Sequence, residues 1–256
     1  MCDTSNPSTS TNKNLLTNKK VTVVLPTYNE ASNLPDVTHS LFSLDLPTLN
    51  VIVVDDGSPD GTGQVAEQLA IRLGGHLEVI HRDTKQGLGT AYVAGFKRAI
   101  QNGAEVVIEM DADQSHDVTY LPAFLNHLES SDVVIGSRYV RGGGSEEWSA
   151  FRRFISGLGN LGIRWVAGLK VHDATSGFKA FRVSVLKRLD MDVFRCSGFG
   201  FQVEMAHACQ QMGYRVIEHP IIFKKRADGK SKMSAFIVAE ALWKLFFLRW
   251  RTQIRN

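Results

Sequence analysis

The chain has 256 residues, of which 43% are hydrophobic and 21% are charged, so it can bury about three quarters of its unfolded surface and build one complete enzyme core. A formal net charge of +3 is too small to indicate a nucleic-acid-binding protein. Its three cysteines, Cys2, Cys196 and Cys209, lack paired CxxC spacing, which argues against a disulfide framework and a zinc site and favours a reducing compartment.

The first twenty residues are rich in Ser, Thr, Asn and Lys. They contain no apolar stretch of the length that a signal peptide or an anchor needs. We therefore predict that residues 1–20 are a disordered leader and that the catalytic domain spans residues 21–232.

From Val21 onward, short β-branched runs alternate with segments of helical length, which is the pattern of βαβ units with a parallel sheet. The runs are mostly apolar and lack a strict apolar/polar alternation, as in strands that helices cover on both faces. The predicted strands are Val21–Leu25, Val51–Val54, Leu77–Ile80, Val106–Met110 and Val133–Gly136. The predicted helices begin at Pro35, Thr62, Leu88 and Val118. The expected fold class is α/β, a Rossmann-like, mostly parallel sheet flanked by helices.

After Gly136 the pattern becomes less regular. We expect a glycine-rich loop at Arg141–Ser145, a helix near Phe151–Val166 and an irregular stretch containing Asp173–Lys179. A helix at 201–212 and two strands within Tyr214–Phe223 follow. We predict that this half contributes the elements that hold the second substrate, the acceptor of a transferred group.

Two acidic clusters follow predicted strands, where ligands bind in open α/β sheets. Asp55 and Asp56 follow the second strand, and Asp111 and Asp113 follow the fourth. The Asp-x-Asp pair predicts a site for Mg²⁺ or Mn²⁺, because both carboxylates can approach one cation and leave room for diphosphate oxygens. Ser115 or His116 would add a ligand or a supporting contact, or would cap the next helix.

The segment Gly87–Tyr92 partly matches a dinucleotide-binding loop. Tyr92 occupies the place of the third glycine, and the chain has no Walker lysine motif, so a nicotinamide dehydrogenase and a P-loop phosphotransferase are both disfavoured. The glycines instead predict close packing of a helix N-terminus.

The C-terminal end combines a basic loop, 224–232, with an apolar segment, Met233–Trp250. As a helix this segment would be about 27 Å long, against a hydrocarbon core of about 30 Å. Its charges, Glu240 and Lys244, would be costly to insert into a bilayer. We therefore predict that residues 233–256 form an amphipathic helix at a membrane interface, the alternative being an ordinary packed helix.

The order of these motifs resembles that of dolichol-phosphate mannose synthases over roughly residues 21–232. The matching motifs are Pro26–Glu30, Asp55–Thr62, Gly87–Ala91, Asp111–Asp113, Gly136–Tyr139, Trp148, Arg152, Asn160, Thr175–Phe178, Phe201–Glu204, Arg226 and Gly229–Lys232. The full Asp55–Thr62 motif is closer to the mannose synthases than to the related glucosyl-phosphate enzymes.

The resemblance implies an inverting glycosyltransferase of the A-type fold that moves mannose from GDP-mannose to a polyprenyl (dolichyl) phosphate. Pro26, Tyr28, Glu30 and Asp55 or Asp56 would then hold the nucleotide. Asp111 and Asp113 would hold the diphosphate and the Mg²⁺ or Mn²⁺, with Ser115 at the position of a third ligand. The cations expected around the phosphates are Arg138, Arg152, Arg226 and Lys232.

The same resemblance implies a peripheral protein on the cytoplasmic face of a membrane, with a small membrane-anchoring subunit as an optional partner and no nucleic acid. Two other functions stay open. One is glucosyl transfer from UDP-glucose to a polyprenyl phosphate, and the other is a catalytically silent nucleotide-binding scaffold.

Overall fold

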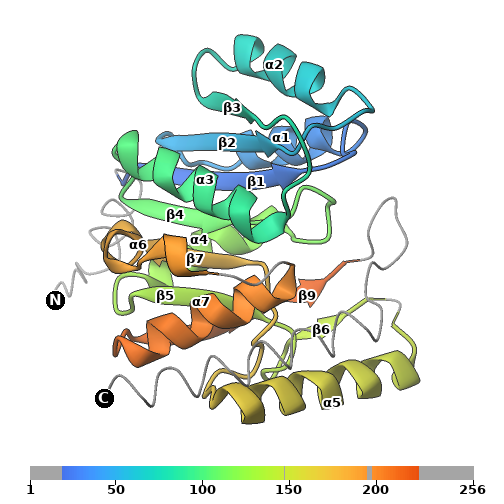
Figure 1. The fold of residues 1–256 in the computed structure, drawn as a ribbon, viewed down its shortest axis with the longest axis vertical. Coiled ribbons are helices and arrows are strands. Elements are labelled where there is room, and N and C mark those ends of the chain that lie inside the picture. Colours follow the sequence, from blue (N-terminus) through green and yellow to red (C-terminus); the bar gives the residue numbers. More distant parts are fainter. Residues whose placement is uncertain (1–18, 147, 195–197, 225–256) are drawn as a thin grey trace, which may run out of the picture.

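The structure is a computed structural model that describes residues 19–146, 148–194 and 198–224 (Figure 1). Its strands are β1 (Val21–Thr27), β2 (Leu49–Asp55), β3 (Leu77–His81), β4 (Val106–Glu109), β5 (Val133–Ser137), β6 (Gly144–Ser145), β7 (Lys179–Arg182), β8 (Val216–Pro220) and β9 (Ile222–Phe223). Seven of them form one sheet in the order β3-β2-β1-β4-β7-β5-β8, in which only β7 runs antiparallel to its neighbours. The short strands β6 and β9 pair in parallel apart from it.

Helices cover both faces of the sheet. They are α1 (Leu34–Phe42), α2 (Thr62–Arg72), α3 (Leu88–Gln101), α4 (Leu121–His127), α5 (Ala150–Ala167), α6 (Val183–Arg188) and α7 (Phe199–Gln211), with 3₁₀ turns η1 (Val118–Tyr120) and η2 (Met191–Val193). Side chains of α1, α2 and α4 share one core, and those of α3, α5, α6 and α7 share the other. Along β1, Val23 and Leu25 enter the first core and Val24 enters the second. Because successive side chains enter different cores, apolar residues follow one another along β1 without a polar face.

Local sequence features fix where individual helices lie. A Cβ atom at Gly95 of α3 would lie 2.3 Å from Cγ1 of Val24, so only glycine lets this helix approach β1 so closely. In α5, the Ser149 hydroxyl accepts a hydrogen bond from the Arg152 N–H at 3.2 Å, and Gly168 ends the helix with φ of 65°. Both ends of α5 are therefore specified locally.

The five predicted strands and the helices that begin near Pro35, Thr62, Leu88 and Val118 are confirmed, so the mostly parallel α/β fold is correct. The sequence did not predict the antiparallel strand β7, which begins at Lys179. The two strands expected within Tyr214–Phe223 are present, but β8 pairs with β5 and β9 pairs with β6.

Two predicted terminal segments fall largely outside the described residues, which begin at Lys19 and end at Lys224. Within the predicted leader, the Lys19 carbonyl accepts a hydrogen bond from Thr48, and Lys20 donates to Glu105 and Asn102. The predicted interfacial helix, 233–256, lies outside the described part. Among the described helices, none has the length and hydropathy needed to cross a bilayer.

Candidate active site

The first element of the site is the turn after β2. Because β1 and β2 are parallel and in register, Thr27 lies beside Asp55 and both chains leave the sheet at the same edge. Asp55 accepts hydrogen bonds from the Ser58 hydroxyl at 2.5 Å and the Ser58 N–H at 3.2 Å. Asp60 accepts from the backbone N–H groups of Ala31 and Thr62. These contacts join the turn after β2 to the loop after β1.

Asp56 holds the other side of this turn. Its carboxylate pairs with Arg82 at 2.6 Å and accepts from the backbone N–H groups of Gln86 and Gly87 at 3.3 and 3.2 Å. The side chains of Arg82 and Asp56 are 9% and 6% exposed. Asp56 therefore fixes the loop in front of α3. Arg82, which the sequence analysis did not single out, follows β3 directly at the same edge of the sheet.

The end of β1 and the loop after it carry the other predicted nucleotide residues. Pro26, Tyr28 and Glu30 are all half-buried. The ammonium group of Lys85 lies 3.8 Å from the centre of the Tyr28 ring, and Glu30 accepts a hydrogen bond from Asn33 at 2.8 Å. The Tyr28 ring of this loop thus lies under a cation from the loop between β3 and α3, and that cation can also attract an anionic group.

The turn after β4 brings Asp111 and Asp113 to the same edge, because β4 is parallel to β1. Asp111 accepts a hydrogen bond from the Tyr92 hydroxyl at 3.2 Å, and its backbone N–H donates to Nδ1 of His116 at 3.1 Å. Burial, followed by the negative charge of Asp111, raises the pKa of Tyr92 well above its usual value. Tyr92 therefore stays neutral and serves as a donor to Asp111.

Asp113 is held by its own turn. Its Oδ1 accepts from the Ser115 N–H at 3.1 Å and the Ser115 hydroxyl at 2.5 Å. Both side chains are buried. In this geometry Ser115 orients the Asp113 carboxylate. The predicted third-ligand position therefore lies next to the pair.

A buried ion pair lies beneath this turn. Lys179 of β7 pairs with Glu109 of β4 at 2.7 Å and also donates to the side chain of Gln202 and to the Ser176 carbonyl. Lys179 and Glu109 are 1% and 0% exposed. Burial raises the pKa of Glu109, Lys179 opposes that rise, and Asp111 adds to it. The strand that the sequence did not predict thus supplies the cation that balances a carboxylate two residues before Asp111.

Arg138, at the end of β5, is fixed by a carboxylate. Its Nε and Nη2 donate to the two oxygens of Asp173 at 2.8 Å each, and Nη2 also donates to Thr175 at 2.9 Å. Burial raises the pKa of Asp173, but Arg138 and its hydrogen bonds hold that pKa below its usual value. Asp173 is 0% exposed, and no motif in the sequence marked it as a site residue.

Aromatic rings connect the arginines to the acidic turn, which is the turn after β4 that carries Asp111 and Asp113. The Phe223 ring lies 5.6 Å from the His116 ring, 5.6 Å from the guanidinium of Arg138 and 6.1 Å from the Trp148 ring. Arg152 in turn stacks on Trp148 at 4.6 Å. Phe223 therefore stands between the acidic turn and the two arginines. It is a further residue of the site for which the sequence offered no signal beyond its place in a short strand.

Residues 22–190 match the family model described as glycosyl transferase family 2. The chain belongs to this family. It is 43% identical to the undecaprenyl-phosphate mannosyltransferase of Micrococcus luteus, over 87% of this chain and 91% of the relative. It is 39% identical to the polyprenol monophosphomannose synthase of Mycolicibacterium smegmatis, over 89% and 86% of the two chains.

Solved structures share the fold of this family 2 glycosyltransferase. One is a mannosyltransferase from Pyrobaculum calidifontis in complex with GDP-Man and Mn²⁺, with a TM-score of 0.59 and 21% identity over 93% of this chain and 65% of that one. Another is the glucosyl-3-phosphoglycerate synthase of Mycobacterium tuberculosis in complex with Mn²⁺, UDP-glucose and glycerol 3-phosphate, with a TM-score of 0.65 and 18% identity over 96% and 86%. They confirm the A-type glycosyltransferase fold.

The acidic turn of this family 2 glycosyltransferase suits a divalent cation. Asp111 and Asp113 offer carboxylate oxygens, the ligands that Mg²⁺ and Mn²⁺ prefer. Within residues 19–146, 148–194 and 198–224, no three His, Cys, Asp or Glu side chains form a metal-holding group. A cation at Asp111 and Asp113 would therefore take its remaining oxygens from water or a bound diphosphate, which is how Mg²⁺ commonly binds at phosphate-transfer sites.

Two of the predicted cations, Arg226 and Lys232, lie outside the described residues. Lys224, the first residue of the basic loop, is described and shows where that loop begins. Its backbone N–H donates to the Ser115 carbonyl at 3.0 Å, and its ammonium group pairs with Asp117 at 2.7 Å. The basic loop therefore begins next to the acidic turn.

Proposed function

We propose that this family 2 glycosyltransferase transfers mannose from GDP-mannose to a polyprenyl phosphate with inversion, giving polyprenyl-phosphate mannose and GDP. One observation carries the proposal. The turn that carries Asp111 and Asp113 contacts Phe223 through His116, and Phe223 also contacts Arg138 and Trp148, on which Arg152 stacks, in a chain that is 43% identical to an undecaprenyl-phosphate mannosyltransferase. An acceptor that is itself a phosphate explains why so many cations stand beside a diphosphate site.

The donor, GDP-mannose, has a nucleoside part and a diphosphate part, and we assign them to different elements of the site. We assign the base and ribose to the loops that carry Tyr28 and Asp56, because these loops leave the sheet beside Asp111. Asp111 and Asp113 would hold a Mg²⁺ or Mn²⁺ ion, which neutralises negative charge on the leaving diphosphate when bound. Tyr92 and Ser115 keep the two carboxylates oriented through the hydrogen bonds that they donate.

The acceptor side needs cations that hold a phosphate close to another phosphate. Asp173 and Thr175 occupy Nε and Nη2 of Arg138, and in the described part of the chain no protein acceptor is bound to its Nη1. These remaining donors suit a phosphate oxygen. Arg152, Arg226 and Lys232 would add charge on the same side, since Arg152 contacts Trp148 and the basic loop begins at Lys224.

The bond changes are simple. A phosphate oxygen of the lipid attacks C1 of mannose as the bond from C1 to the GDP oxygen breaks, so the configuration at C1 inverts. No general base is required, because a phosphate monoester has a second pKa of about 6 and is mostly ionised at neutral pH. The residues of the chain therefore act by orientation and by charge. Three cysteines without disulfide spacing support a reducing, cytoplasmic side of the membrane for this reaction.

A donor test decides between sugars. Radiolabelled GDP-mannose and UDP-glucose are offered separately with polyprenyl phosphate and Mg²⁺ or Mn²⁺, and label in the lipid fraction is measured. We expect transfer from GDP-mannose alone. Transfer from UDP-glucose alone would replace the proposal with the glucosyl alternative. Binding of GDP without transfer to any lipid phosphate would favour the silent scaffold.

A further inference from the structure

Gln202, near the start of α7, carries a buried amide group with an unused donor. The residue is 1% exposed, and its Oε1 accepts a hydrogen bond from the ammonium group of Lys179. An ammonium group only donates, so the amide must turn its oxygen toward Lys179 and its nitrogen away. Among the residues that the structure describes, Nε2 of Gln202 has no hydrogen-bond partner. A buried donor without a partner is costly, which points to a ligand as its acceptor.

This nitrogen borders a small space beside the acidic turn. A Cβ atom at Gly177 would lie 3.5 Å from Nε2 of Gln202, and 3.6 and 3.7 Å from the two carboxylate oxygens of Asp111. These are ordinary contact distances, so the missing side chain at Gly177 leaves room for a group of about the size of a methyl or a hydroxyl. A hydroxyl in this space can accept from Gln202 while it stays next to the carboxylate that we assign to the diphosphate.

Packing of α7 on α3 holds the nitrogen in place. Phe201 stacks on Tyr92 with ring centres 6.0 Å apart, and Tyr92 donates to Asp111 at 3.2 Å. A Cβ atom at Gly89 would lie 3.0 Å from Phe201, so the start of α7 approaches α3 closely. Gln202 and Asp111 are therefore fixed relative to each other through one stack of rings.

Lys179 strengthens the amide and has no donor left for a ligand. Its ammonium group donates to Glu109 at 2.7 Å, to the Ser176 carbonyl at 2.6 Å and to Gln202. These three acceptors use all three of its N–H groups. A cation at the amide oxygen polarises the amide and makes Nε2 a stronger donor. The buried pair of Lys179 and Glu109 thus acts on a ligand through Gln202.

The order of the strands identifies the part of the donor that reaches this space. In the proposed reaction, C1 of mannose must lie between the diphosphate, near Asp111, and the lipid phosphate, near Arg138. Strand β7 stands between β4, which leads to Asp111, and β5, which leads to Arg138, and Gly177 belongs to the loop before β7. The mannosyl group therefore lies over Gly177, and its hydroxyl groups are the acceptors closest to Nε2.

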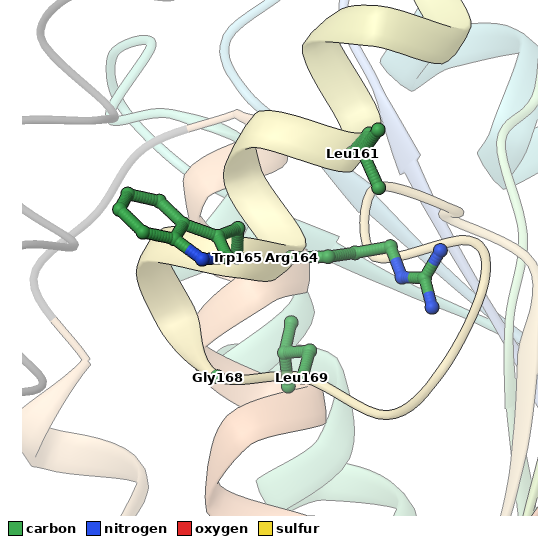
Figure 2. A pocket seen from close by; sticks show the side chains of 5 residues that line it. All are labelled: Leu161, Arg164, Trp165, Gly168 and Leu169. Carbon is green, nitrogen blue, oxygen red and sulfur yellow. The ribbon is translucent and has the colours of Figure 1, made fainter.

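An open hollow of about 390 Å³ at the end of α5 does not offer this combination. Leu161, Arg164, Trp165, Gly168 and Leu169 line it. Figure 2 shows the Arg164 side chain pointing away from Trp165. The lining contains no carboxylate and no residue of the acidic turn or of the loop before β7. It therefore lacks the groups that the cation of a sugar diphosphate needs.

We infer that Gln202 donates a hydrogen bond from Nε2 to a hydroxyl group of the transferred mannosyl unit and thereby helps to select the sugar. The inference rests on the proposed function, because it concerns the same donor. It gives a contact with the sugar to a residue that holds neither the cation nor a phosphate. Such a contact discriminates strongly, because a sugar without the matching hydroxyl leaves a buried donor unpaired.

A cycle of changes in the protein and in the sugar measures this contact. Wild type and Gln202→Met are each assayed with GDP-mannose and with analogues that lack the hydroxyl group at C2, C3, C4 or C6. We expect one analogue to lower kcat/KM of the wild type by at least about tenfold and to cause no further loss in Gln202→Met. GDP affinity, measured by calorimetry, should be nearly equal in the two proteins. Gln211→Met, on the same helix but exposed, should respond to every analogue as the wild type does.

The outcomes separate the inference from the proposed function. Equal losses for every analogue in wild type and Gln202→Met would overturn the inference. Glu109 offers the alternative acceptor, because its Oε2 also has no partner in the described part of the chain. A lower Tm for Gln202→Met without coupling to any hydroxyl would show that Nε2 serves Glu109, and would overturn the inference too. Absence of transfer from GDP-mannose by the wild type would instead refute the proposed function.

Gly177→Ala tests the space without disturbing Lys179. The new methyl group meets Gln202 and Asp111 at ordinary contact distances, so Tm and GDP affinity in Mn²⁺ should match those of the control Gly159→Ala, whose methyl group meets nothing within 4 Å. We expect the methyl group to take the place of the sugar hydroxyl and to raise KM for GDP-mannose by at least about tenfold. A Gly177→Ala enzyme that transfers mannose with the KM of Gly159→Ala would overturn the inference.

Discussion

The substitution Asp173→Asn tests whether the buried ion pair of Arg138 and Asp173 stabilises the part of the site that we assign to the acceptor. Asp173 is 0% exposed and the Arg138 side chain is 14% exposed, so the variant leaves a largely buried guanidinium without its counter-charge. Breaking a buried pair by removing one partner costs about 3–5 kcal/mol of folding free energy. For a chain of this size that loss lowers Tm by roughly 6–20 °C.

The assay is thermal and chemical unfolding, and two controls isolate the buried charge. Asp192→Asn removes the partner of Lys97 from an exposed pair, with side chains 78% and 49% exposed, and should change stability by less than about 0.5 kcal/mol. The double variant Arg138→Gln with Asp173→Asn should be more stable than Asp173→Asn alone, because it removes the unpaired charge. A double variant that is less stable than Asp173→Asn would refute the reasoning.

The pH dependence has a definite sign. Arg138 holds the pKa of Asp173 below its usual value, so the pair contributes its full stability above the unfolded pKa of about 3.9. That contribution is lost as the pH falls through the lower folded pKa. The difference in unfolding free energy between wild type and Asp173→Asn should therefore be constant near neutral pH and shrink in acid below about pH 4. A difference that grows in acid would contradict the pairing.

Three further predictions concern the donor side. Asp113→Ala should lower the rate of label transfer by at least about 10²-fold in protein that circular dichroism shows to be folded, as loss of a preorganised electrostatic group does elsewhere; near-wild-type turnover would remove Asp113 from the site. Asp56→Ala releases Arg82 and two backbone N–H groups, so calorimetry should show GDP affinity weakened by about 10–100-fold. Lipid-phosphate binding should change less, and the exposed Asp45→Ala should leave both affinities unchanged. Excess EDTA should abolish transfer and added Mg²⁺ or Mn²⁺ should restore it, whereas full activity in EDTA would exclude a cation at Asp111 and Asp113.

The parallel half of the fold was predictable because its signals are local. Each strand there is a mostly apolar run, and the acidic residues at the ends of β2 and β4 stand where parallel strands must end together. Asp55 accordingly ends β2, and Asp56, Asp111 and Asp113 lie on the turns after β2 and β4, all at one edge of the sheet. The same logic applies to Arg138, which directly follows β5.

The other half depends on partners that are distant in sequence. Strand β7 has four residues, two of them charged. Its Lys179 can be buried because it pairs with Glu109, which lies 70 residues earlier in the chain. Asp173 lies 35 residues from the arginine that it fixes. Neither pairing leaves a periodic pattern. The sequence also did not show that apolar side chains of α5 face outward, because periodicity alone does not distinguish a helix face that packs on the core from one that turns away from it.

The direction of β7 explains how the acceptor side is assembled. In a parallel sheet, the ligand edge is formed by the loops that follow the C-terminal ends of the strands. Because β7 runs antiparallel between β4 and β5, the loop that precedes its N-terminal end lies at this same edge. The loop before β7, with Asp173 and Gly177, therefore arrives at the edge where β4 delivers Asp111 and β5 delivers Arg138. A Cβ atom at Gly177 would lie 3.6 Å from Oδ1 of Asp111, which shows how close this loop comes to the acidic turn. A parallel β7 would carry Asp173 to the opposite edge and leave Arg138 without its carboxylate. The single reversed strand thus brings Asp173 and Arg138 to the sheet edge that carries Asp111, where we propose that a diphosphate and a second phosphate bind.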